Sequence, residues 1–232
     1  MVKFSRQVIV VAAHPDDEVL GCGGTIARHA DSGDQVHVLI VAEGSTSRQQ
    51  KRDRSQVGDE LSALAKAAQA AGSILGAASV ELLDLPDNRL DSLDRLDLIK
   101  RIEECVERHQ PECVYVHHAG DVNVDHRRLH EAVVTACRPT PGHVVKSLLS
   151  FEVASSTEWQ PPGSAPAFQP NWFVDISAQW ERKKEALSTY LSEMRDWPHA
   201  RSLKAVEHLA RWRGAQVGVE AAEAFCLLRQ LV

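Results

Sequence analysis

Several features that would indicate a membrane, secreted or redox protein are lacking in this sequence. No apolar run approaches the roughly 20 residues of a transmembrane helix, so we expect no membrane span. Met1 to Arg6 lead into the first predicted strand without the apolar region of a signal peptide. The five cysteines are odd in number and have no C-x-x-C spacing, which favours reduced thiols and predicts a cytoplasmic protein.

The sequence is also poor in features that bind nucleic acids or nucleotides. The 26 Lys and Arg residues are outnumbered by 32 Asp and Glu residues, and the net charge is −6. No basic patch interleaved with aromatic residues occurs, so we expect no nucleic-acid partner. Segments of the form G-x-S-x-G or G-K-[ST] are absent, which excludes the usual serine-hydrolase elbow and the P-loop.

What is present indicates one α/β domain spanning residues 1–232, since 44% hydrophobic residues suffice for a sizeable core. Predicted strands at 8–13, 35–42, 80–83, 113–116, 148–153 and 172–176 alternate with predicted helices, including 53–75 and 93–106. This alternation predicts a single doubly wound, mostly parallel, Rossmann-like sheet with helices on both faces. From Ala178 onward we expect a charged helical tail, with an apolar side made of Trp180, Leu187, Tyr190 and Leu191.

The polar stretch Ala13–Glu18 falls between a buried strand and Gly21–Thr25, whose small residues would let a helix lie close against that strand. The carboxyl end of a strand is where open α/β proteins bind ligands. His14 and Asp17 are three residues apart and can point at one metal ion, with Asp16 between them as a base for an activated water. Helix capping explains one acid well, but not three acids and a histidine.

A second polar cluster, residues 117–126, also follows a predicted strand and precedes a predicted helix. Because the carboxyl ends of parallel strands lie at one edge of the sheet, this loop can face the first cluster and supply a third metal ligand. His117, His118, His126, His130 and His143 are the histidines available, of which His130 and His143 are expected to be surface or capping residues.

With these two clusters, the sequence resembles the PIG-L (LmbE-like) family of zinc-dependent N-deacetylases. The family motif A-H-P-D-D-E is present in full at residues 13–18, and Asp125-His126 follows the later strand. The likeness extends through residues 21–25, 85–89 and 151–152. It implies a Rossmann-like fold and removal of acetyl groups from N-acetylglucosamine conjugates and related amino sugars. The partner would be a small N-acetylated sugar. Homo-oligomers are common in that family, so the resemblance leaves open whether this chain forms one.

The resemblance also implies residue roles. His14, Asp17 and His126 would bind Zn²⁺, and Asp16 would be the general base that takes a proton from water whose pKa zinc lowers toward ~7. Asp125 would orient a ligand imidazole, or else cap a helix.

Among the later histidines His126 is preferred as the third ligand, since it opens the helix at the sheet edge that faces His14 and Asp17. His130 would lie one turn deeper, about 6 Å along the axis. His117 ends a strand and is expected to pack or to line the pocket wall.

The catalytic acid and the substrate contacts are less specified by the sequence. Many members of the resembled family have histidine where this chain has Asn123, whose amide can donate a hydrogen bond to an oxyanion but cannot deliver a proton. Protonated Asp16, or His118, could then be the acid. Arg48, Asp87 and Arg89 follow predicted strands on the same edge and are candidate substrate contacts, although each alone is more often a solvated turn residue.

Two alternative functions would use some of the same residues. A metal-dependent phosphoesterase could hold two cations with Asp16, Asp17 and Asp125, but that scheme usually needs more carboxylates and leaves His14 unexplained. A non-catalytic nucleotide-binding α/β module could use the glycines at 21–24. However, the third glycine of G-x-G-x-x-G would fall at Ile26, and the preceding acids would repel a pyrophosphate.

Overall fold

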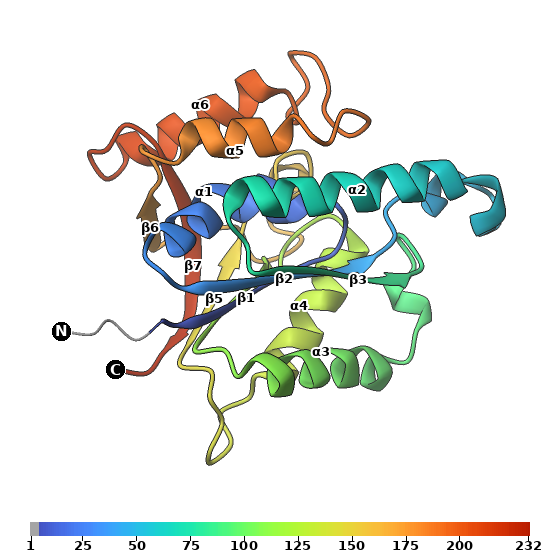
Figure 1. Cartoon of the computed structure of the whole chain (residues 1–232), viewed down its shortest axis with the longest axis horizontal. Coiled ribbons are helices and arrows are strands. Elements are labelled where there is room, and N and C mark those ends of the chain that lie inside the picture. The colour runs from blue at the N-terminus through green and yellow to red at the C-terminus, as the bar shows by residue number, and fades with distance from the viewer. Residues whose placement is uncertain (1–4) are drawn as a thin grey trace.

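A seven-stranded sheet forms the centre of the computed structural model, which describes residues 5–232 (Figure 1). The strands are β1 Gln7–Ala12, β2 Gln35–Ala42, β3 Ser79–Leu85, β4 Cys113–His117, β5 Ser147–Phe151, β6 Trp172–Asp175 and β7 Ala222–Gln230. Their spatial order is β3-β2-β1-β4-β5-β7-β6. The first five strands in this order are parallel, whereas β7 is antiparallel to both of its neighbours.

The central strands are buried on both faces, as their runs of β-branched residues predict. In β1, Val8 and Val10 contribute to the core on one side of the sheet, and Ile9 and Val11 contribute to the core on the other. This alternation follows from the two-residue period of a strand. It places two helical layers against the same sheet and confirms the predicted doubly wound, mostly parallel fold.

Helices cover both faces of this sheet. They are α1 Asp17–Asp31, α2 Gly58–Leu75, α3 Arg95–His109, α4 Val124–Ala136, α5 Trp180–Leu187 and α6 Leu203–Ala215. In Figure 1, α1, α2, α5 and α6 lie above the sheet and α3 and α4 lie below it, in agreement with the two hydrophobic clusters. Within residues 5–232, no helix combines the length and the apolar composition needed to cross a membrane.

The glycines of α1 permit a close approach, although not to β1 as expected. A Cβ placed on Gly21 would lie 2.3 Å from the ring of Phe151 in β5, and one on Gly24 would lie 2.6 Å from Ile176. The small residues therefore let α1 pack against the side of the sheet that leads to β6. A side chain at either position would push the helix away from the sheet.

The C-terminal tail departs from the prediction of a wholly helical segment. Its last element is β7, which inserts between β5 and β6. The segment begins Ala-Glu-Ala, whose residues carry little strand propensity, so its pairing with two neighbouring strands determines its conformation. Leu191, expected on the apolar side of the tail, is 83% exposed. The helix predicted over 53–75 begins at Gly58, after a 3-10 turn at Arg54–Gln56.

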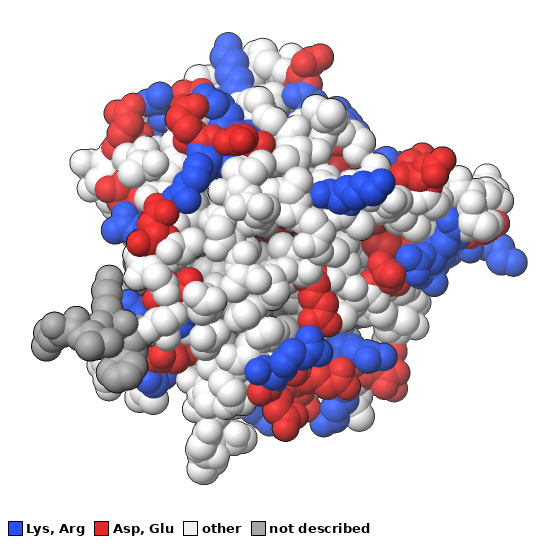
Figure 2. All heavy atoms as spheres, in the orientation of Figure 1, with Lys and Arg blue, Asp and Glu red and all other residues white. Residues whose placement is uncertain are grey.

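The loops that follow β1, β2, β3, β4 and β5 leave the sheet at the same edge, because these strands are parallel. This edge carries both polar clusters identified in the sequence. On the face of the molecule shown in Figure 2, basic and acidic side chains are interspersed in small groups. That pattern agrees with the chain's modest net charge of −6.

Candidate active site

The turn between β1 and α1 positions His14, Asp16 and Asp17. Asp16 has φ +115°, a left-handed conformation that L-residues rarely adopt and that is often found at functional sites. It occupies the N-cap position of α1, yet its side chain makes no capping hydrogen bond. The His14 backbone N–H instead donates to Asp17 Oδ2 at 2.9 Å. Helix capping therefore does not account for the Asp16 carboxylate.

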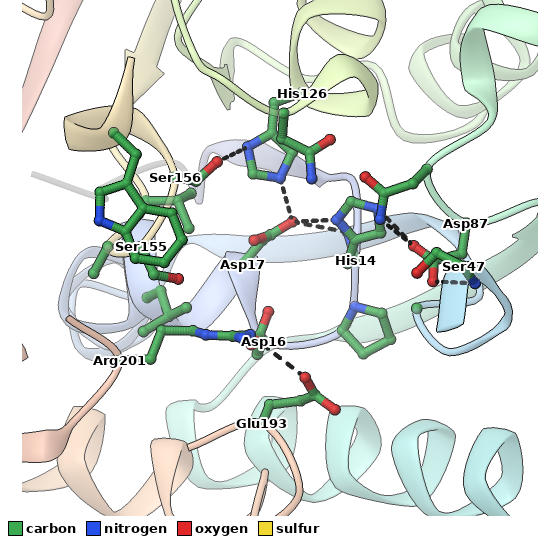
Figure 3. A pocket seen from close by; sticks show the side chains of 18 of the residues that line it. His14, Asp16, Asp17, Ser47, Asp87, His126, Ser155, Ser156, Glu193 and Arg201 are labelled. Atoms are coloured by element: carbon green, nitrogen blue, oxygen red, sulfur yellow. Dashed lines mark hydrogen bonds and ion pairs between the residues drawn. The ribbon is translucent and has the colours of Figure 1, made fainter. Parts of the chain in front are cut away.

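The first turn of α4 places His126 opposite that turn. Asn123 is the N-cap, and its Oδ1 accepts the Asp125 N–H at 2.8 Å. His126 Nε2 and His14 Nδ1 each lie 3.2 Å from Asp17 Oδ2 (Figure 3). One ligand atom from each of His14, Asp17 and His126 lies within 4.8 Å of the other two. The structure thus brings together the three residues that are predicted from the sequence as metal ligands.

The second ring nitrogen of His14 is held by two carboxylates. Its Nε2 lies 3.0 Å from Asp125 Oδ2 and 3.2 Å from Asp87 Oδ1. Asp125 is fully buried and also accepts the backbone N–H groups of Asn88 and Leu90 at 2.7 and 2.9 Å. It therefore orients the imidazole from behind, as carboxylates behind metal-binding histidines commonly do. The alternative capping role falls to Asn123.

His126 is supported in the same way from the opposite side. Its Nδ1 lies 3.2 Å from Asp121 Oδ2, and Asp121 also accepts hydrogen bonds from Ser156 and Thr157. Burial by itself would lower the pKa of His126, but the carboxylates of Asp17 and Asp121 outweigh it and raise this pKa to about 9. The ring is thus fixed through Nδ1, and Nε2 faces Asp17.

The donor set fits a divalent metal ion. His126 Nε2 is buried and has no hydrogen-bond partner, although buried polar atoms are normally satisfied. A cation bound by two imidazole nitrogens and one carboxylate oxygen would satisfy this atom. The same donors also match a three-ligand catalytic zinc site.

Beside these ligands lies a polar cavity of about 250 Å³, into which Asp16 points (Figure 3). Burial raises the pKa of the Asp16 carboxyl well above its ordinary value, the adjacent Asp17 adds to the rise, and the Arg201 guanidinium opposes it. Glu18 lies behind this turn, where its Oε2 accepts the Asp16 N–H at 3.0 Å and Tyr190 donates to Oε1. Asp16 thus lies on the cavity wall. Within residues 5–232 it belongs to neither of the groups of side chains that could bind a metal ion.

The other predicted site residues divide into two groups. Arg48, Asp87 and Asn123 line the cavity, whereas His118 and Arg89 are not among its lining residues. The His118 ring is turned to Pro166, whose carbonyl oxygen lies 3.0 Å from Nε2, and it packs edge-on against Phe168. His118, one of the two residues expected as the acid, therefore does not lie on the cavity wall, because its ring is hydrogen-bonded to the loop that follows β5. Arg89 is half-buried in the turn after β3.

Two other histidines are accounted for by contacts with the backbone. His117 Nε2 accepts the Ala13 N–H at 2.8 Å, and its ring stacks on His126 with centroids 3.8 Å apart. His117 thus packs beneath the site, as expected. His130 Nδ1 lies 2.7 Å from the His117 carbonyl oxygen, so it donates to that oxygen and is not directed to the ligands.

Several cavity residues were missed because they come from the C-terminal half, where the sequence offers no motif. Ser155, Ser156 and Trp159 line the cavity from the segment after β5. Glu193 and Arg201 line it from the segment between α5 and α6. Only the fold brings these segments to the carboxyl edge of the sheet.

The two-cation alternative is not supported by the geometry. A second group of possible ligands is His14 with Asp87 and Asp125, but it shares its histidine with the first group. Both Asp125 oxygens already accept backbone N–H groups. Among residues 5–232, Asp16 belongs to neither group.

Comparison with known proteins identifies a family and finds relatives that are named as hydratases and as deacetylases. The family model described as "PIG-L: GlcNAc-PI de-N-acetylase" matches residues 9–137, more than half of the chain. A 4-oxalmesaconate hydratase of Pseudomonas putida is 30% identical over 84% of this chain and 76% of its own length. A 1D-myo-inositol 2-acetamido-2-deoxy-alpha-D-glucopyranoside deacetylase of Rhodococcus jostii is 27% identical over 90% and 92%. The crystal structure of the 4-carboxy-2-hydroxymuconate hydratase GalB from Pseudomonas putida superposes with a TM-score of 0.77 at 26% identity, covering 98% of both chains.

Proposed function

Since this chain belongs to the PIG-L family, we propose that it removes the acetyl group from an N-acetylated amino sugar or its conjugate by zinc-dependent hydrolysis. The observation that carries the proposal is the pairing of a complete three-ligand set with a separate carboxylate, Asp16, on the wall of one polar cavity. Amide hydrolysis needs both: an electrophilic ion beside the carbonyl and a base for the attacking water.

His14, Asp17 and His126 would hold the zinc ion. When bound, zinc lowers the pKa of water toward ~7 and polarises a carbonyl oxygen. Asp125 and Asp121 would keep the two imidazoles in the required orientation by accepting hydrogen bonds from their outward nitrogens.

Asp16 would take one proton from the attacking water at a carboxylate oxygen. The water oxygen bonds to the carbonyl carbon, the C–N bond breaks, and the same proton passes from Asp16 to the leaving amine. Acetic acid and a free amino sugar result, the acetic acid releases its proton to the solvent to give acetate, and Asp16 returns to its initial state. Asp16 would thus serve first as base and then as acid, because His118 does not line the cavity.

Asn123 would contribute to binding the oxygen that gains charge. Its Oδ1 already accepts the Asp125 N–H, so only its Nδ2 donors remain for a ligand. Hydrogen-bond donors placed at a developing oxyanion commonly contribute about 10²–10³-fold to a rate.

The cavity suits one sugar-sized group. Its volume of about 250 Å³ lies just under the usual ~300–1,000 Å³ of small-molecule pockets, so the rest of a conjugate would extend past the exposed Trp159. Arg48 and Asp87 would contact hydroxyl groups or a charged substituent at this end. The cytoplasmic location, the one-domain organisation and a homo-oligomeric state remain predictions.

Hydration of an unsaturated carboxylic acid is the second candidate, because the relative at 30% identity and the structure at TM-score 0.77 are both named as hydratases. Asp16 could equally take a proton from water that adds to a carbon–carbon double bond. Arg48 and Arg201 on the cavity wall would then face substrate carboxylates.

One experiment separates the two. Zinc-loaded protein is incubated with N-acetylglucosamine linked to inositol, to malate or to a second sugar, and separately with 4-oxalmesaconate. Acetate and free amine are measured in the first set, and loss of the conjugated double bond in the second. Acetate release that disappears in Asp16→Asn supports the proposal, whereas hydration without acetate release supports the second candidate.

A further inference from the structure

Four side chains of alternating charge run along one wall of the cavity. Arg48 Nη2 lies 2.9 and 3.1 Å from the two carboxylate oxygens of Glu193. Glu193 Oε2 lies 3.4 Å from Arg201 Nη1, and that same nitrogen lies 3.3 Å from Asp16 Oδ2. All four residues line the cavity, and the row ends at the carboxylate proposed as the base (Figure 3).

The two carboxylates of this row are more buried than its two arginines. The Arg48 side chain is 52% exposed and that of Arg201 is 25% exposed, whereas the carboxylates of Glu193 and Asp16 are 7% and 5% exposed. Charge-assisted hydrogen bonds between such shielded groups are stronger than those between exposed ones. Glu193 thus restrains the same Arg201 Nη1 group that contacts Asp16.

Arg201 is the one described residue whose side chain hydrogen-bonds to the Asp16 carboxylate. The turn fixes the Asp16 backbone, and Glu18 accepts its N–H, but neither contact fixes the carboxylate group itself. Arg201 and Glu193 also lie beyond residues 9–137, the part matched by the family model.

We propose that Arg201 is a positioning residue that holds the Asp16 carboxylate toward the cavity, and that Glu193 holds Arg201 in turn. This inference rests on the proposed function in one respect, namely that Asp16 is the group that moves the proton. Without Arg201, the carboxylate can rotate about its side-chain bonds while the zinc ligands stay in place. A displacement of about 1 Å in a reacting group can lower a rate by ~10²-fold.

Two other roles for Arg201 predict different results. If Arg201 binds an anionic group of the substrate, its removal raises KM and leaves kcat unchanged. If it only ties the segment between α5 and α6 to the fold, its removal lowers the unfolding temperature, and added guanidinium does not restore turnover.

The test compares Arg201→Ala and Glu193→Gln with Arg211→Ala, which removes an exposed arginine from α6 in the same C-terminal region. Zinc content, unfolding temperature, kcat and KM are measured for each, with and without millimolar guanidinium chloride. Crystal structures of zinc-loaded wild-type protein and Arg201→Ala show the Asp16 side chain directly.

We expect Arg201→Ala to retain its zinc and to lose ~10²-fold in kcat with little change in KM, with partial recovery on addition of guanidinium. Glu193→Gln should lose less, and Arg211→Ala should match wild type. In the Arg201→Ala crystal the Asp16 carboxylate should leave its single orientation. An Asp16 side chain unchanged in that crystal overturns the proposal, as does a loss confined to KM.

These readouts also separate this inference from the proposed function. If wild-type protein releases no acetate from any conjugate, the deacetylase proposal fails. The orientation of Asp16 in the two crystals still decides whether Arg201 positions it.

Discussion

Replacing His126 by alanine tests the placement of the third metal ligand. In the wild-type chain, His126 Nε2 is buried, lacks a hydrogen-bond partner and lies 3.2 Å from Asp17 Oδ2. Its removal leaves only His14 and Asp17 to hold an ion. We expect His126→Ala to fold, because its neighbours Asp121, Ser156 and Thr157 keep their mutual hydrogen bonds.

The size of the effect can be bounded. Removing a residue that merely supports a metal ligand typically weakens metal affinity by about 10–100-fold, so removing the ligand itself should cost more than ~10²-fold. At free zinc ten times the wild-type Kd, wild-type protein is about nine-tenths occupied. A variant whose affinity is 100-fold weaker is then about one-tenth occupied.

The assay is equilibrium dialysis at that zinc concentration, followed by metal analysis of the protein. His130→Ala is the matched control, since His130 is four residues further along α4 and is bonded to the His117 carbonyl. It should keep wild-type zinc content. If His130→Ala loses its zinc and His126→Ala keeps it, the placement of the third ligand is refuted.

Three further predictions concern the proposed base, the pH dependence of zinc binding and a buried ion pair outside the site. Asp16→Asn should keep its metal and lose ~10²–10⁴ in kcat, as is usual when a general base is removed; near-normal turnover would transfer the role to another group. In metal-free protein the His126 pKa, lowered by burial but raised further by Asp17 and Asp121, is about 9, above the ordinary ~6.5. Burial lowers the pKa of His14, the other imidazole ligand, but Asp125, Asp17 and Asp87 outweigh it and raise this pKa well above its ordinary value as well. Zinc must displace a proton from each imidazole, so its apparent affinity should increase more than ~tenfold per pH unit as the pH rises from 6.5 toward 9, as chelator-competition titrations would show; a flat profile contradicts this. Lys183→Ala should cost ~3–5 kcal/mol in urea unfolding, because Lys183 Nζ donates to the buried Glu223 at 2.6 Å, while Lys184→Ala, at an exposed pair, should cost less than ~1 kcal/mol.

The sequence predicted those parts of the site whose residues are neighbours in the chain or directly follow parallel strands. His14, Asp16 and Asp17 lie on one turn, and parallel strands bring the turn after β4 to the same edge, so His126 could be placed opposite them. The structure brings these residues together as expected, and their roles in zinc binding and catalysis stay predictions. Asp125 was recognised as a candidate support for an imidazole because it precedes His126.

The remaining wall of the cavity could not be predicted from the sequence. Glu193 and Arg201 lie in an irregular segment between two helices, and no periodicity or spacing relates them to Asp16, which is 185 residues away from Arg201. Strand β7 was missed for a related reason: its conformation depends on pairing with β5 and β6 more than on its own residues. His118 was misplaced because adjacent residues after a strand can point in opposite directions.

Acetate release from N-acetylated amino sugar conjugates tests the proposed activity most directly. The measurement is the amount of acetate and free amine formed by zinc-loaded protein, by the same protein after complete metal removal, and after zinc is restored. The proposal predicts equal amounts of acetate and amine, loss of both on metal removal and recovery with zinc. Acetate release that persists without metal would contradict the mechanism, and hydration of 4-oxalmesaconate without any acetate would contradict the function.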